Sequence, residues 1–285
     1  MTLQKAEQII AEAITGIYEK PEAENIAGIL IEFITGLDRT QQVVQKKKEI
    51  SGNQSMVFQE AVQRLKEYEP IQYIIKEAWF HGLKFFVDER VLIPRPETDE
   101  LVEKIISYLK ETKKNKATIL DIGTGSGCIA VSLKKQLPGL SVTAIDESKD
   151  ALEVARINAE SLQTEIEFRQ INFTDKKNRA ALPAFELIVS NPPYIPEKDK
   201  TSMHRNVLDY EPHTALFVPD NNPLLFYEAI AGFAADHLAK GGAIFLEIHE
   251  ELGDAVKALF DSTSYSAVEI IKDMQGKDRI VKIVR

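Results

Sequence analysis

The stretch TILDIGTGSGCIA, residues 118–130, decides the fold of this chain. An apolar run typical of a strand is followed at once by a glycine-rich turn and then by residues typical of a helix. Gly123, Gly125 and Gly127 let the backbone turn sharply, and they let a ligand approach without a Cβ in the way. The spacing differs from the G-x-G-x-x-G dinucleotide loop, since the third glycine comes one position early, and the terminal Lys-Ser/Thr of a phosphate loop is missing. Two interpretations of this stretch therefore remain: a loop that binds a ligand and a tight turn with a purely structural role.

Strand and helix patterns alternate through the rest of this region. Strands are expected at 118–122, 141–146, 165–170, 185–190, 241–248, 265–273 and 278–284, and helices near 127–136, 149–160, 223–239 and 251–260. Strands separated by helices predict a parallel, doubly wound sheet. The last two strands must be antiparallel, because the connection through Gly276 is too short for a crossover. The predicted fold class is therefore α/β, with a doubly wound, mostly parallel sheet of seven strands.

The residues before this sheet follow other patterns. Apolar residues recur at helical spacing within 6–17, 26–34 and 58–65, which predicts a small helical bundle. Aromatic and β-branched residues then surround Gly82, which predicts a β-hairpin that bridges two domains. We expect a helical domain over 1–75, a hairpin linker over 76–93 and the main α/β domain over 94–285.

Composition and charge exclude several classes of protein. The 285 residues are 44% hydrophobic and 28% charged, as in an ordinary soluble globular chain. No apolar run reaches membrane-spanning length and the first residues lack a signal-peptide pattern, so we expect a cytoplasmic protein without a membrane partner. The single cysteine, Cys128, excludes an internal disulfide, and we interpret it as a buried apolar residue; the scattered histidines predict no metal site. A net charge of −9 does not favour nucleic acid.

Asp146 ends the second expected strand of the sheet. An acid at that position can accept hydrogen bonds from both hydroxyls of a ribose. A ligand that carries ribose but no phosphate fits S-adenosylmethionine better than NAD or ATP. The alternative is that Asp146 caps the next helix, although Ser148 could serve as that cap instead.

A double proline follows the fourth expected strand in VSNPPYIPE, residues 189–197. The two rings fix the backbone, which by itself fits a simple strand terminator. Beside a methyl donor, however, the Asn191 side-chain oxygen and the Pro192 carbonyl oxygen could each accept one N–H of a planar amide or amine. The nitrogen lone pair would then face the methyl group, and Tyr194 would offer a ring on which the planar group stacks. This stretch therefore predicts methylation of a planar nitrogen.

At this point the chain resembles the class I S-adenosylmethionine-dependent methyltransferases, and among them the peptide chain release factor N5-glutamine methyltransferases (the PrmC/HemK family). Six stretches carry the resemblance, from residue 69 to the C-terminal region: EPIQYI (69–74), LIPRPETDELV (92–102), DIGTGSGCIA (121–130), VSNPPYI (189–195), YEPHTALF (210–217) and KDRIV (277–281). The likeness implies methyl transfer from S-adenosylmethionine, with S-adenosylhomocysteine as product. The implied substrate is the glutamine of the Gly-Gly-Gln motif in bacterial class 1 release factors, with the helical domain 1–75 recognising it.

The resemblance also assigns site residues. Asn191, Pro192 and Tyr194 would be catalytic, and with Pro193 they would hold the substrate amide. IPRPET would line the methionine end of the cofactor site, without individual roles for its residues. The implied cofactor-binding residues are Gly123, Thr124, Gly125, Ser126, Gly127, Asp146, Phe173 and Asn191.

Three departures from the family pattern concern loops. Ile75 and Lys76 stand where a glycine is usual, His249 replaces another glycine, and residues 218–230 lack the usual Gly- and Asp-rich composition. We expect a monomer, and we interpret the long loop 196–222 as a candidate lid. Three rival hypotheses remain: a glutamine methyltransferase of a ribosomal protein, a nucleic-acid adenine methyltransferase, and a cofactor-binding protein without chemistry.

Overall fold

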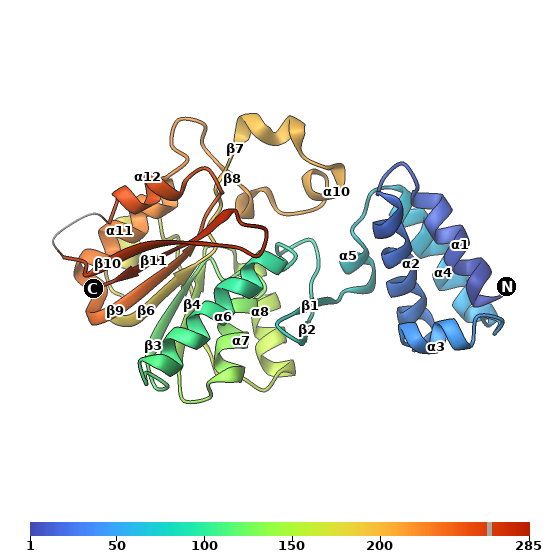
Figure 1. The fold of residues 1–285 in the computed structure, drawn as a ribbon, viewed down its shortest axis with the longest axis horizontal. Helices are drawn as coiled ribbons and strands as arrows, with labels where there is room; N and C mark the ends of the chain where they lie inside the picture. Colours follow the sequence, from blue (N-terminus) through green and yellow to red (C-terminus); the bar gives the residue numbers. More distant parts are fainter. Residues whose placement is uncertain (261–263) are drawn as a thin grey trace. The chain divides into compact units, whose positions relative to one another are not determined.

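The computed structural model describes residues 1–260 and 264–285. The chain divides into two compact units (Figure 1). The helical unit comprises Met1–Glu77 and Met203–Tyr210, and the α/β unit comprises Ala78–Ser202 and Glu211–Arg285. The return of residues 203–210 to the helical unit is not expected from the sequence.

The helical unit is built around one apolar core. Its helices bury the residues that recur at helical spacing, including Ile10, Leu30 and Leu65, which are 0% exposed. The two shortest of the N-terminal helices were not predicted, because five or six residues are too few to show a helical period. The elements are α1 (Leu3–Ile14), α2 (Lys20–Thr35), α3 (Arg39–Val44), α4 (Gly52–Lys66), α5 (Ile71–Ile75) and, from the later segment, α10 (Arg205–Leu208).

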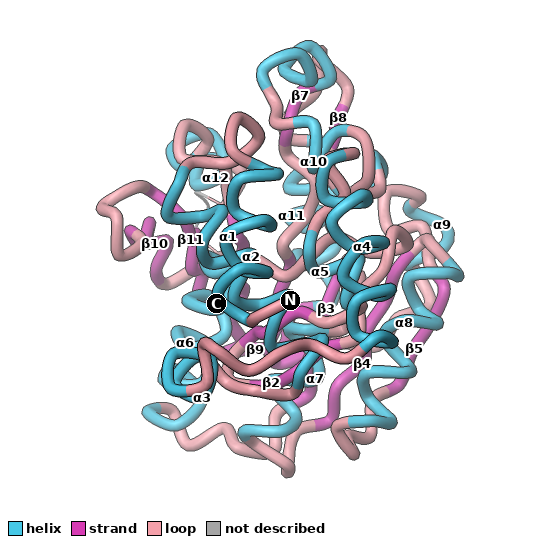
Figure 2. Tube along the Cα trace, turned by 90° about the vertical axis from the view of Figure 1, so that its right-hand side faces the viewer, coloured by secondary structure: helices cyan, strands magenta, loops and turns pink. Residues whose placement is uncertain are grey.

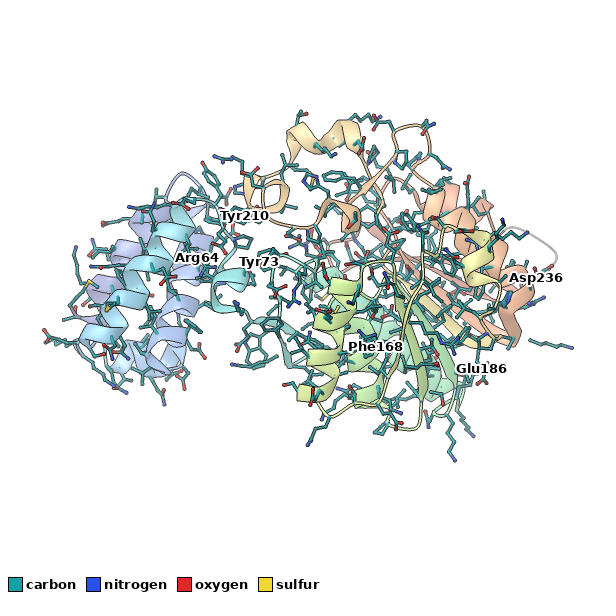
Figure 3. All side chains as sticks on the ribbon, turned by 180° about the vertical axis from the view of Figure 1, so that it is seen from behind. Arg64, Tyr73, Phe168, Glu186, Tyr210 and Asp236 are labelled. Atoms are coloured by element: carbon teal, nitrogen blue, oxygen red, sulfur yellow. The ribbon has the colours of Figure 1, made fainter. Side chains whose placement is uncertain are left out.

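The segment 203–210 is fastened to the helical unit by side chains of its own. The His204 imidazole Nε2 lies 2.8 Å from the carbonyl oxygen of Ile17. The Tyr210 hydroxyl donates to the carbonyl oxygen of Glu67 at 2.7 Å, and Figure 3 labels Tyr210 beside Arg64 on this unit. The Arg205 guanidinium lies 4.1 Å from the ring centroid of Tyr68.

A seven-stranded sheet forms the centre of the α/β unit, in the order β10-β11-β9-β6-β3-β4-β5. The pairs β3–β4, β4–β5, β3–β6 and β6–β9 are parallel, and Figure 2 shows β4 and β5 side by side. Strands β9, β11 and β10 pair antiparallel, which confirms the fold class predicted from the sequence. The strands are β3 (Thr118–Ile122), β4 (Ser141–Asp146), β5 (Glu167–Gln170), β6 (Phe185–Ser190), β9 (Leu238–Glu247), β10 (Ala267–Lys272) and β11 (Asp278–Val284).

Helices cover both faces of this sheet because successive strand residues point to opposite faces. Ile119 and Phe245 belong to the core under α6, α7 and α8, whereas Leu120 and Ile244 belong to the core under α11 and α12. Strands buried on both sides explain the continuous apolar runs in the sequence. The helices are α6 (Pro96–Glu111), α7 (Cys128–Gln136), α8 (Lys149–Ser161), α9 (Lys176–Arg179), α11 (Leu225–His237) and α12 (Gly253–Ala258).

The expected hairpin is present but short. Strands β1 (Ala78–Phe80) and β2 (Leu83–Phe85) pair antiparallel over three residues each. Phe80 and Phe85 belong to the core of the α/β unit, so the hairpin is part of that unit. Asp99 accepts from the backbone N–H of His81 at 3.0 Å, which ties the turn to the start of α6.

The chain between the Asn-Pro-Pro turn and α11 is not a plain loop. It contains the short parallel pair β7 (Ile195–Pro196) and β8 (Phe217–Val218), the 3-10 helices Glu197–Ser202 and His213–Ala215, and α10. Its action as a lid stays a prediction. None of the helices within residues 1–260 and 264–285 has both the length and the apolar character of a membrane span.

Candidate active site

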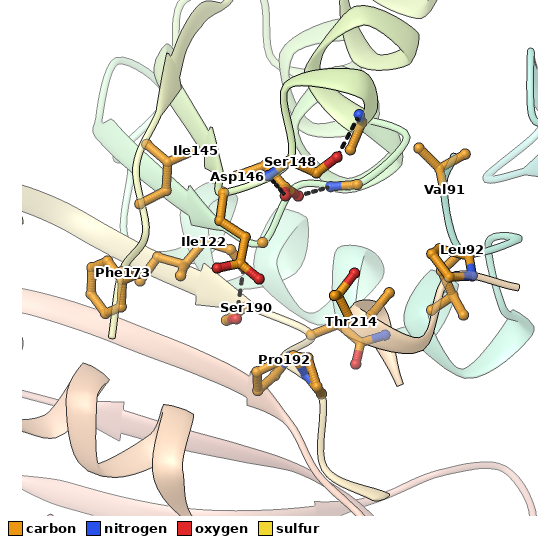
Figure 4. Close-up of a pocket in the computed structure, with 18 of the residues that line it drawn as sticks. Val91, Leu92, Ile122, Ile145, Asp146, Ser148, Phe173, Ser190, Pro192 and Thr214 are labelled. Carbon is orange, nitrogen blue, oxygen red and sulfur yellow. Dashed lines mark hydrogen bonds between the residues drawn. The ribbon is translucent and has the colours of Figure 1, made fainter. Parts of the chain in front are cut away.

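A cavity of about 790 Å³, including space open to solvent, lies at the carboxyl ends of β3, β4 and β6 (Figure 4). The order of the sheet reverses at β3, since β4 lies on one side of it and β6 on the other. Open α/β sheets bind their ligands at such a switch point. The cavity brings together the glycine loop, Asp146, Phe173 and the Asn-Pro-Pro turn, as the sequence predicts.

The three glycines of the loop have different surroundings. Gly123 and Gly125 line the cavity with φ of 71° and 53°, and a Cβ built on either would meet nothing within 4 Å. Gly127, with φ of 80°, faces the protein instead: a Cβ there would lie 3.1 Å from the Cβ of Ala155 on α8. The first two glycines therefore leave room on the cavity side, and the third lets α7 approach α8 closely.

Asp146 is held by two backbone N–H groups. Its Oδ2 accepts from Gly125 N and its Oδ1 accepts from Ser148 N, both at 2.9 Å (Figure 4). A carboxylate oxygen has two lone pairs, so each oxygen keeps a second acceptor site. Burial raises the pKa of Asp146. Ser148 caps α8, with its side chain accepting from Ala151 N, so the sequence alternative of Asp146 as this cap does not hold.

Thr124 and Ser126 do not line the cavity but support the loop from behind. The Thr124 hydroxyl donates to Asp121 Oδ2 at 2.7 Å, and both groups are buried. Burial raises the pKa of Asp121 to about 7. The carbonyl oxygen of Ser126 accepts from Asn158 Nδ2 at 2.9 Å. Asn158, which the sequence analysis missed, sits on α8 and thus fixes the loop from a neighbouring helix.

Phe173 forms an apolar wall of the cavity beyond β5. Its ring is held edge-on by Phe233, with the ring centroids 5.3 Å apart, and the Arg179 guanidinium lies 5.0 Å from its centroid. A fixed aromatic ring of this kind suits a flat heterocycle such as adenine.

Asn191, Pro192 and Pro193 line the cavity directly after β6, whereas Tyr194 does not. The Tyr194 ring packs near His249, with ring centroids 6.0 Å apart. Burial raises the pKa of Tyr194 to about 12, so its hydroxyl is protonated at neutral pH.

Two buried residues that the sequence analysis did not single out hold Asn191. Asn191 Nδ2 donates to Thr98 Oγ1 at 3.0 Å, and the Thr98 hydroxyl donates to Glu247 Oε2 at 2.7 Å. Thr98 lies in the first turns of α6 and Glu247 is the last residue of β9. No motif links three residues so far apart in sequence.

A salt bridge ties IPRPET to the YEPH stretch. Arg95 Nη2 lies 2.6 Å from Glu211 Oε1, and the Glu211 side chain is only 1% exposed. Burial raises the pKa of Glu211 while Arg95 opposes this shift. The salt bridge thus connects the residue that precedes α6, Arg95, to the segment after Glu211, in which Pro212 and Thr214 line the cavity.

Two further groups bear on the chemistry. Burial raises the pKa of the Cys128 thiol to about 12, which fits an apolar role rather than that of a nucleophile. In the part of the chain that the structure describes, no three His, Cys, Asp or Glu side chains are arranged to hold a metal ion.

Four features together define a class I methyltransferase. The sheet is open and doubly wound. One cavity at its edge contains a glycine loop without a phosphate-binding lysine, an acid at the end of the second strand and an Asn-Pro-Pro turn. The family model of the methyltransferase small domain matches residues 95–210, and that of the PrmC N-terminal domain matches residues 2–75. A methyltransferase from Pyrococcus furiosus shares the fold, with a TM-score of 0.50, 22% identity and coverage of 71% of this chain and 88% of that chain.

Relatives of nearly equal length identify the family. A release factor glutamine methyltransferase from Flavobacterium psychrophilum is 42% identical over 275 residues, which is 95% of each chain. A protein of the same name from Bacteroides thetaiotaomicron is 39% identical over 272 residues, with 95% of this chain and 96% of the relative covered. The chain belongs to the release factor glutamine methyltransferase family.

Proposed function

We propose that this protein transfers a methyl group from S-adenosylmethionine to the side-chain amide nitrogen of the glutamine in the Gly-Gly-Gln motif of bacterial class 1 release factors. The observation that carries the proposal is the position of Asn191 and Pro192 in the same cavity as the glycine loop and Asp146. The names of the relatives support the substrate.

The cavity fits S-adenosylmethionine. Its lining offers an acid for ribose hydroxyls, an aromatic ring for a heterocycle and open space beside the glycine loop. Asp146 would accept from the ribose hydroxyls through its two remaining acceptor sites, Phe173 would contact the adenine, and the open space beside Gly123 and Gly125 would take the rest of the molecule. When bound, S-adenosylmethionine supplies an electrophilic methyl group and is converted to S-adenosylhomocysteine.

The Asn-Pro-Pro turn would hold the glutamine amide. Asn191 Oδ1 and the Pro192 carbonyl oxygen would each accept one N–H, which leaves the nitrogen lone pair as the free direction. Because both proline rings fix φ, these acceptors are positioned before the substrate arrives. Tyr194 does not line the cavity, so the proposed stacking of the planar amide on its ring requires the ring to turn toward the substrate. The proton on the methylated nitrogen is lost easily, so no strong base is required.

The remaining assignments follow from this substrate. The helical domain 1–75 would recognise the release factor, and the loop 196–222 would close over the site. We propose a monomer that acts in the cytoplasm, where release factors work. The net charge of −9 argues against a stable complex with nucleic acid.

Mass spectrometry tests the proposal directly. The protein is incubated with a class 1 release factor and S-adenosylmethionine, and the Gly-Gly-Gln peptide is analysed. One added methyl group on the glutamine side chain is expected with the wild-type protein and with Asn115→Ala, an exposed control before β3 and away from the cavity. Asn191→Ala should bind cofactor but give no product. Methylation by Asn191→Ala at the wild-type rate would contradict the proposed role of the turn.

A further inference from the structure

A buried chain of hydrogen bonds leads from the sheet to Asn191. It starts at Glu247, which is 1% exposed, passes through Thr98, which is 3% exposed, and ends at the Asn191 amide in the cavity wall. The two bonds measure 2.7 and 3.0 Å between heavy atoms. Thr98 and Glu247 do not line the cavity, and the hydrogen bond to Asn191 connects them to its wall.

The chemistry of these three groups sets the direction of the chain. An ionised carboxylate can only accept, so the Thr98 hydroxyl must give its single proton to Glu247. The same oxygen can then only accept from Asn191, and in an amide only Nδ2 donates. The amide is thereby fixed with its nitrogen toward Thr98, and its carbonyl oxygen is the atom left to accept from a substrate.

We infer that Thr98 and Glu247 are positioning residues that keep the Asn191 amide in the orientation needed to accept an N–H of the substrate. The inference rests on the proposed function of Asn191. The reversed amide would present its own NH2 to the substrate NH2, and two donors repel. Buried groups with fixed hydrogen-bond directions preorganise a site at no cost during the reaction.

The direction of the hydrogen bonds from Asn191 through Thr98 to Glu247 depends on pH, because the surroundings of Glu247 shift its pKa. Burial raises its pKa to about 7, the Thr98 hydrogen bond and the nearby Arg279 and Arg95 lower it, and Glu97 raises it further. Tyr194 and Tyr227 also face it and are neutral at this pH, because burial raises the pKa of each.

Below pH 7 the protonated Glu247 carboxyl can donate to Thr98. The Thr98 hydroxyl is then free to donate to Asn191 Oδ1, so the reversed amide becomes accessible beside the productive one. We therefore expect kcat to be high above pH 7 and to fall as the pH drops through that value.

Substitutions at Thr98 separate positioning from packing. Thr98→Val keeps the volume but removes the hydroxyl, and kcat should fall about tenfold to hundredfold while the affinity for S-adenosylhomocysteine stays unchanged. Thr98→Ser keeps the hydroxyl and should retain most of kcat. Thr143→Val is the matched control. It also removes a threonine hydroxyl that bonds to a glutamate, Glu167, at 3.2 Å, but Thr143 lies on β4 and does not line the cavity. The kcat of this variant should equal that of the wild type.

The pH profile of kcat at saturating cofactor gives a readout that a merely structural role would not move. The wild type should lose activity below pH 7. Glu247→Gln permits both amide orientations at every pH, so its kcat should be low and should not vary between about pH 6 and 8. Glu247→Gln and Thr98→Ser also keep the inference testable if Thr98→Val does not fold.

The outcomes distinguish the inference from the proposed function. A wild-type kcat for Thr98→Val, or a wild-type acid limb for Glu247→Gln, together with an inactive Asn191→Ala, overturns the positioning role and leaves the function standing. Full activity of Asn191→Ala overturns both. A low kcat of Thr98→Val, recovery in Thr98→Ser and a flat profile for Glu247→Gln support the inference.

Discussion

Replacing Asp146 by asparagine tests the ribose site, because it changes one carboxylate oxygen into an NH2 group and leaves the size of the side chain almost unchanged. The wild-type carboxylate accepts from two backbone N–H groups, of Gly125 and Ser148, and keeps two acceptor sites for ribose hydroxyls. In Asp146→Asn one of the two oxygens becomes an NH2 group. Whichever way the amide turns, this group faces a backbone N–H, and the negative charge that the ribose hydroxyls would meet is lost.

The magnitude follows from these bonds. A hydrogen bond to a charged group contributes about 1.5–3 kcal/mol, so its loss should raise the Kd for S-adenosylhomocysteine about 10- to 150-fold. The free energy of unfolding should change less than the free energy of cofactor binding. The unpaired backbone N–H destabilises the folded state, but burial raises the pKa of Asp146, so the wild-type charge is itself unfavourable in the folded state at pH 7. These two effects oppose each other.

Isothermal titration calorimetry with S-adenosylhomocysteine, alongside thermal unfolding without ligand, measures both quantities. Asp150→Asn is the matched control, since Asp150 is an exposed acid in the first turn of α8. Its Kd should equal that of the wild type. An unchanged Kd for Asp146→Asn would refute the assignment of the ribose to this carboxylate.

Three further substitutions test the loop, with urea unfolding as the measurement. Gly127→Ala should lower the free energy of unfolding by about 2 kcal/mol or more, because its φ is positive and the new methyl group would lie 3.1 Å from Ala155. Gly125→Ala, which meets nothing within 4 Å, should cost only about 1–2 kcal/mol but should weaken cofactor binding, and equal effects of the two would contradict their different roles. Asn158→Ala removes three side-chain hydrogen bonds and should destabilise the protein by about 2–4 kcal/mol, whereas an unchanged unfolding midpoint would argue against its bracing of the loop.

The sheet could be predicted from the sequence because its strands carry their signal locally. The strands over 185–190 and 278–284 begin and end where the apolar, β-branched runs do. The short helices α3 and α5 could not be predicted, since a helical period needs more residues than they contain. The hairpin was predicted as a linker between two domains, whereas Phe80 and Phe85 pack in the core of the α/β unit and make the hairpin part of it; which core they join depends on partners distant in the sequence.

The site was predictable only for the residues that belong to a motif. Gly125 and Gly127 look alike in the sequence, and only the neighbouring Ala155 shows that one faces the cavity and the other faces a helix. Thr98 and Glu247 lie 149 residues apart along the chain, so nothing local signals that they meet. Glu211 and Arg95 were quoted within motifs, but the salt bridge between them needed the fold.

The membership of residues 203–210 in the helical unit has a consequence for synthesis on the ribosome. When the first 77 residues have left the exit tunnel, Ile17, Glu67 and Tyr68 still lack the partners that residues 203–210 supply. Those partners are translated only after strands β3 to β6, which make up more than half of the central sheet. The nascent chain therefore cannot finish its first unit before its second is well advanced. A gene truncated after the first 77 residues would therefore encode a helical unit without its later segment.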